Sequence, residues 1–80
     1  MESKIAVVAI IVSDLTAVER VNSLLHEFGE HIIGRLWIPH KERKVNVISV
    51  VMDALPEVIN ALSGKLGMIK GVSSKVLTTK

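Results

Sequence analysis

A chain of 80 residues can form one small domain, near the lower size limit for a self-sufficient hydrophobic core. The absence of cysteine excludes disulfides, thiolate metal sites and cysteine nucleophiles. A formal net charge of only +2, with a single Trp and a single Phe, disfavours nucleic-acid binding, which usually requires a basic face and stacking aromatic side chains.

Six secondary-structure elements are predicted in chain order, and the first is a strand over residues 4–12. Its residues, KIAVVAIIV, are almost wholly apolar and rich in β-branched side chains, as in a strand buried on both faces. Residues 14–28 then repeat apolar side chains every three or four positions, which predicts an amphipathic helix. Asp14 is one candidate for the N-cap of this helix, and Thr16 with Glu19 could instead form a capping box.

The rest of the chain predicts a hairpin, a second helix and a last strand. Residues 31–39 and 45–52 have the composition of strands, and the polar turn 40–44 joins them. Pro56 suits the first turn of the second helix. Residues 70–79 form the last and most polar strand.

The element order β-α-β-β-α-β predicts one α+β domain over residues 1–80. Two β-α-β units joined by a hairpin give a ferredoxin-like sandwich, with an antiparallel four-stranded sheet in the order 4-1-3-2 and two helices on one face. The composition agrees with this order, because the two most apolar strands fall at the centre and the polar fourth strand at an edge.

The sheet face opposite the helices is predicted to be apolar and open. Strict alternation in the second strand directs four residues toward the helices: Ile32, Gly34, Leu36 and Ile38. It directs four others to the open face: His31, Ile33, Arg35 and Trp37. Because either face of the first strand is apolar, we expect a homo-oligomer (dimer or tetramer) through the open face, most simply a two-fold dimer. A bound apolar ligand is the alternative.

Three of these residues form a candidate ligand site at the rim of the open face. His31, Arg35 and Trp37 could bind an anionic or planar ligand through charge-assisted hydrogen bonds and stacking. The simpler alternative is that they are interface residues with ordinary partners. His26 and His40 are expected to be solvated.

The stretch HEFGEHIIGR (26–35) is close to the zinc-protease signature H-E-x-x-H. That signature needs histidines four residues apart, on one helix face. His26 and His31 are five apart, about 140° from each other on a helix, so no metal site is predicted. Asp14 and Asp53 follow the first and third strands, where a carboxylate pair is conceivable, although helix capping explains both. We expect no enzyme activity and no cofactor.

Several motifs in register identify a resemblance to a known family. They are N-x-L-L-H-E, I-x-G-R, A-L-S-G-K-L-G and G-V-x-x-K, within VNSLLHEFGEHIIGRLWIP and ISVVMDALPEVINALSGKLGMIKGVSSKV. Through them, nearly the whole chain resembles the small iron-only hydrogenase system regulators of anaerobic bacteria. That family is similar in turn to ACT-type ligand-sensing domains and to the C-terminal domain of nickel-responsive repressors.

The resemblance implies a stand-alone, oligomeric, ACT-like regulatory module. It would sense a small molecule and regulate transcription or a hydrogenase system through a protein partner; the alternative is a ligand-free assembly or interaction module. ACT-type domains often bind amino acids beside the loop after the first strand, where a glycine lets the ligand approach. Here that loop, residues 13–16, contains no glycine, so Asp14 and Thr16 are either ligand contacts or helix caps.

The same comparison restricts the metals, partners and location that we expect. The chain has no cysteine and no H-x-H, so nickel sensing is not implied. The nickel-responsive repressors carry a DNA-binding segment before the first strand of this domain. In the present sequence only residues 1–3 precede that strand, so direct nucleic-acid binding is not expected. Without a cleavage motif or an apolar run long enough to span a bilayer, we expect a cytoplasmic protein with no membrane contact.

Overall fold

The computed structural model describes residues 2–79 of the chain. Its elements are the strand β1 (Lys4–Val12), the 3₁₀ turn η1 (Leu15–Ala17), the helix α1 (Val18–Glu27), the 3₁₀ turn η2 (Gly29–His31), the strands β2 (Ile32–His40) and β3 (Val45–Ala54), the helix α2 (Pro56–Gly67) and the strand β4 (Val72–Thr78). Within these residues, no helix is long and apolar enough to cross a membrane.

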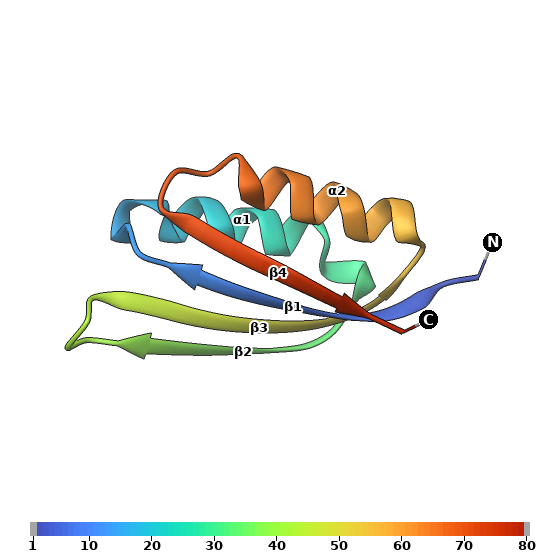
Figure 1. The fold of residues 1–80 in the computed structure, drawn as a ribbon, viewed down its shortest axis with the longest axis horizontal. Helices are drawn as coiled ribbons and strands as arrows, with labels where there is room; N and C mark the ends of the chain where they lie inside the picture. The colour runs from blue at the N-terminus through green and yellow to red at the C-terminus, as the bar shows by residue number, and fades with distance from the viewer. Residues whose placement is uncertain (1, 80) are drawn as a thin grey trace.

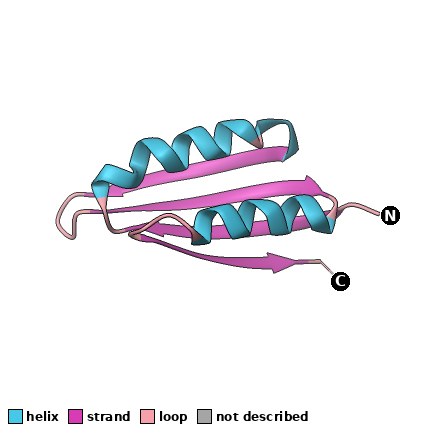
Figure 2. Cartoon of the chain, turned by 90° about the horizontal axis from the view of Figure 1, so that it is seen from above, coloured by secondary structure: helices cyan, strands magenta, loops and turns pink. Residues whose placement is uncertain are grey.

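The four strands form one antiparallel sheet in the order β2-β3-β1-β4. Both helices lie on the same face of this sheet, side by side when seen from above (Figures 1 and 2). This is the predicted α+β ferredoxin-like arrangement, since 4-1-3-2 is the same order counted from the other edge. The prediction of the fold is therefore confirmed, and β1 has the predicted ends.

The hydrophobic core lies between the sheet and the helices. In β1 every second residue is buried beneath the helices, because successive side chains of a strand point to opposite faces. The fully buried large side chains come from both central strands and both helices: Ile10, Leu25, Ile48, Met52, Ile59, Leu62, Leu66, Val8, Val12, Val21 and Val50. The two most apolar strands thus supply most of the sheet's share of the core.

Asp14 is the N-cap of the first helical segment, η1, as one of the two predicted capping arrangements requires. The Asp14 Oδ1 atom accepts hydrogen bonds from the Thr16 backbone N at 2.9 Å and from the Thr16 Oγ1 at 2.6 Å. These bonds cap η1, which leads directly into α1. Thr16 is therefore a donor to the capping residue and does not itself cap the helix.

A β-bulge in β2 corrects the predicted facing of that strand. Ile32 pairs with Met52, and Gly34 pairs with its neighbour Val51, so Ile33 is one residue too many for β3. An extra residue reverses the alternation of every side chain that follows it. The prediction is right for Ile32. It is wrong for the residues after the bulge: Gly34, Leu36 and Ile38 lie on the open face, whereas Arg35 and Trp37 lie on the helix side.

The loop between α2 and β4 packs closely against the loop after β1. The Ser13 backbone N donates a 2.8 Å hydrogen bond to the Gly71 carbonyl oxygen. Gly71 has a φ of +83°, and a Cβ atom added there would overlap the Asp14 Cβ. Only glycine fits this close approach, because it lacks a Cβ and tolerates a positive φ.

Candidate functional site

The open sheet face is an exposed apolar surface formed by all four strands. Its large apolar residues are Ile5, Val7 and Ile11 in β1, Leu36 and Ile38 in β2, Val47 in β3 and Leu77 in β4. Their exposed fractions run from 37% for Val7 to 74% for Leu77. Single exposed apolar residues are ordinary, whereas large contiguous apolar patches are uncommon on the surfaces of monomeric proteins.

The residues of the open sheet face are ordered from an apolar centre to a polar margin. Val7, in the middle of β1, pairs with Val51 on one side and with Leu77 on the other. The ionisable residues of this face lie on the edge strands or near a strand end: His40 in β2, Lys75 in β4 and Asp53 in β3. An apolar centre with a polar rim is the usual anatomy of a protein–protein interface.

Arg35 and Trp37, predicted at the rim of this face, instead join β2 to the helix side. The Trp37 Nε1 donates a 2.9 Å hydrogen bond to the Oδ1 of Asn46, which is only 9% exposed. This hydrogen bond gives the side-chain oxygen of the buried Asn46 a partner, and the indole ring of Trp37 packs against the core. Arg35 Nη2 donates to Asn22 Oδ1 of α1 at 3.4 Å. Both side chains therefore have structural partners within the chain.

His31 and the Asp14–Thr16 pair lie at opposite ends of the sheet. His31 immediately precedes Ile32, and Ile32 aligns through β3 with Ala6, near the start of β1. The Nε2 atom of His31 is 3.4 Å from a carboxylate oxygen of Glu30. Asp14 follows the end of β1. The separation is at least six residues of strand, about 20 Å. The structure does not bring the five predicted site residues together, and their role in ligand binding stays a prediction.

Asp14 and Asp53 do not form a carboxylate pair. Strands β1 and β3 are antiparallel, and Asp53 pairs with Ile5 near the start of β1. Asp14 lies beyond the other end of that strand. The suggestion that these strand ends are adjacent is wrong, and so is helix capping by Asp53, because Leu55 is the N-cap of α2 and makes no side-chain cap bond.

The hydrogen bonds from Thr16 have a consequence for acid stability. The Thr16 hydroxyl and backbone N–H, followed by the charge of Lys70, hold the pKa of Asp14 below its ordinary value of 3.8. A depressed folded-state pKa means that the ionised carboxylate stabilises the fold above its unfolded pKa. That stabilisation is lost as the pH falls through the folded pKa.

Asp14→Ala is therefore expected to destabilise the chain at neutral pH and much less in acid. The difference in unfolding free energy from the wild type should shrink between about pH 7 and about pH 2, as urea unfolding at each pH would measure. Asp14→Asn is the control, because its amide oxygen still accepts the cap bond without ionising. A difference that does not change with pH would contradict a role for the ionised carboxylate.

No group of metal-ligating side chains is found among the described residues. Within residues 2–79, no three His, Asp or Glu side chains lie together so that they could hold a metal ion.

The structure also contains a cavity between α1 and α2, on the helix side of the sheet, which the sequence patterns did not predict. Its residues come from two helices and a loop, and none of them belongs to a recognisable motif.

The sheet order and the single helix layer define the class as a small ferredoxin-like domain. A solved structure with the same fold is the nitrogen regulatory PII-like protein CPII from Thiomonas intermedia K12, bound to ADP, AMP and bicarbonate. It is 14% identical, with a TM-score of 0.50 over 96% of each chain. At this identity the likeness shows the fold alone.

The family is shown by closer matches. The TM1266-like family, described as a candidate iron-only hydrogenase system regulator family, matches residues 4–76, and the chain belongs to it. The solved structure of the uncharacterized protein TM1266 from Thermotoga maritima is 38% identical, with a TM-score of 0.93 over 99% of this chain and all of that one. No curated protein sequence matches the chain. The resemblance found in the motifs is thereby confirmed.

Proposed function

We propose that this chain is a non-enzymatic regulatory module that works as a homo-oligomer, most simply a two-fold dimer, through its open sheet face. In this proposal it acts in the cytoplasm, senses a small molecule and transmits the signal to a protein partner of a hydrogenase system. The observation that carries the proposal is the open sheet face itself, an apolar centre with a polar rim on an 80-residue chain.

Hydrophobic burial favours a second copy of the chain as the occupant of this face. Each apolar Å² removed from water contributes roughly 25 cal/mol, and a small domain gains proportionately more from such burial than a large one. A two-fold dimer uses the same patch on both copies, so the apolar centres meet and the polar rims stay near solvent. Membership in a family of candidate regulators supports a regulatory role for the assembly.

A ligand-free assembly module is the second candidate function. The observation that favours it is the internal engagement of Arg35 and Trp37, since both expected ligand contacts already bond to Asn22 and Asn46. Both candidates require the open sheet face to be covered. They differ in whether a small molecule binds to the native oligomer.

Native mass spectrometry on protein purified without a metal-affinity tag tests the proposal. We expect the mass of an oligomer. If a ligand stays bound, the measured mass will exceed the summed mass of the chains by the mass of that ligand. Thermal unfolding with amino acids, nucleotides and divalent metals then separates the candidates, because binding to the native state alone raises the melting temperature. A chain that remains monomeric would overturn both candidates. An oligomer whose melting temperature none of these compounds raises would favour the assembly module.

A further inference from the structure

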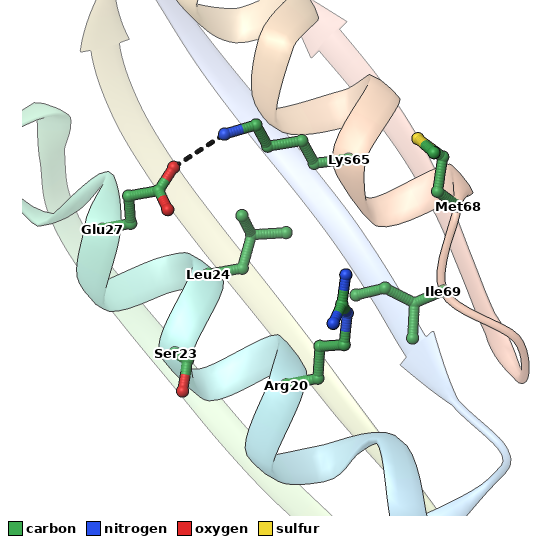
Figure 3. A pocket seen from close by; sticks show the side chains of 7 residues that line it. All are labelled: Arg20, Ser23, Leu24, Glu27, Lys65, Met68 and Ile69. Carbon is green, nitrogen blue, oxygen red and sulfur yellow. Dashed lines mark hydrogen bonds and ion pairs between the residues drawn. The ribbon is translucent and has the colours of Figure 1, made fainter.

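A cavity of about 360 Å³ lies between α1 and α2, on the side of the sheet opposite the open face. Figure 3 shows Arg20 at one end of it, the Glu27–Lys65 pair at the other and Leu24 between them. The lining residues are Arg20, Ser23, Leu24, Glu27, Lys65, Met68 and Ile69. Its volume falls in the range of pockets that hold small molecules, about 300–1,000 Å³.

Helical spacing explains why these side chains converge. On α1 the lining residues fall at i, i+3, i+4 and i+7 from Arg20, which places them on one helix face. On the opposite wall, Lys65, Met68 and Ile69 repeat the same i, i+3, i+4 spacing at the end of α2 and just beyond it. Two such stripes facing each other form the walls, and Leu24, Ile69 and Met68 give them an apolar part.

The charges that line the cavity do not balance. Lys65 Nζ lies 2.8 Å from Glu27 Oε2 and 5.5 Å from the centre of the Phe28 ring, so its ammonium group is already paired. Arg20 forms no ion pair and no side-chain hydrogen bond with any other residue of 2–79. The cavity therefore presents one free guanidinium group beside apolar walls, with a net charge of one positive unit.

We infer that this cavity binds a small organic carboxylate that carries an apolar body. The guanidinium of Arg20 receives the carboxylate through paired hydrogen bonds, the geometry that arginine offers to carboxylates. The apolar body lies against Leu24, Met68 and Ile69. A monoanion matches the one uncompensated charge, whereas inorganic phosphate has no apolar body to place against the apolar walls.

This inference names a ligand class for the proposed sensing function, yet it does not depend on self-association. The cavity faces away from the open sheet face, because both helices that line it lie on the other face of the sheet (Figures 1 and 3). Pairing of two sheets leaves the helix layer of each copy outside the interface. Anion binding and dimer formation are thus measured separately, and either can fail while the other holds.

Amide chemical-shift mapping by NMR with hexanoate, and with its neutral analogue hexanamide, tests the inference. We expect hexanoate to shift the amide signals of residues 20–27 and 65–69, and hexanamide and inorganic phosphate to bind more weakly. Arg20→Gln should weaken hexanoate binding roughly ten- to hundredfold, since it removes a charge-assisted contact. Arg43→Gln, the same substitution in the exposed β2–β3 hairpin, should bind as the wild type does.

The opposite results would overturn the inference. Equal binding of hexanoate and hexanamide would show that the ligand's charge does not contribute to binding. Unchanged hexanoate binding by Arg20→Gln would show that Arg20 does not contact the ligand. Shifts confined to β1 and β2 would place the ligand on the open sheet face instead. Sedimentation of Arg20→Gln, which we expect to match the wild type, shows whether self-association is intact in the same sample.

Discussion

Replacing Val7 by glutamate is expected to abolish self-association while leaving the fold of the chain intact. Val7 lies in the middle of β1, flanked by Val51 and Leu77 on the same face, and is 37% exposed. In the single chain the new carboxylate reaches water. In a two-fold dimer both copies place a carboxylate in the apolar centre, and the like charges of two desolvated groups cost several kcal/mol.

The expected weakening is at least about a hundredfold in the dissociation constant, or about 2.8 kcal/mol. Sedimentation velocity over a range of concentrations measures it, with far-ultraviolet circular dichroism to show that the fold is retained. Asn60→Glu is the matched control, because it adds the same charge at an exposed position of α2 on the other side of the sheet. If Val7→Glu and Asn60→Glu sedimented alike, the open sheet face would not be the interface.

Gly71→Ala is expected to lower the free energy of unfolding by about 2–4 kcal/mol. The positive φ of Gly71 imposes a strain of about 1–2 kcal/mol on an alanine, and crowding adds a similar cost. The new methyl group would overlap the Asp14 Cβ and lie 3.2 Å from the Asp14 backbone N. Rotation of one side chain cannot relieve this, because the hydrogen bond from Ser13 N to the Gly71 oxygen holds the two loops together.

Gly64→Ala provides the contrast within the same chain. Gly64 lies inside α2, and a Cβ atom there meets nothing within 4 Å. Alanine should stabilise the helix by about 0.5–1 kcal/mol at this position. Urea unfolding at one fixed protein concentration compares the two variants, since self-association adds to apparent stability. Equal stability of Gly71→Ala and the wild type would show that the two loops are not in contact.

The fold was predictable because its signals are local and periodic. The apolar β-branched run at residues 4–12 and the three-to-four spacing of the next segment each specify one element, and the β-α-β-β-α-β order leaves few topologies. The structure matches these predictions in strand order and in the helix layer. The choice between Asp14 and the Thr16–Glu19 box depended on hydrogen-bond geometry, which residue types alone do not decide.

The candidate site was less predictable, and the bulge at Ile33 shows why. One unpaired residue exchanged the faces of Arg35 and Trp37 with those of Leu36 and Ile38, and strict alternation contains no signal for it. The cavity lined by Arg20 could not be predicted from the sequence for a different reason, since it depends on how two separate helices lie against each other.

An isotope-filtered NOE measurement on a mixture of labelled and unlabelled chains tests most directly whether the open sheet face is a self-association surface. It detects only contacts between different copies. We expect intermolecular cross-peaks among the methyl groups of that face, including those of Val7, Ile11 and Leu36. An absence of cross-peaks, or cross-peaks only from helix-side residues such as Leu24 and Met68, would contradict the proposed assembly.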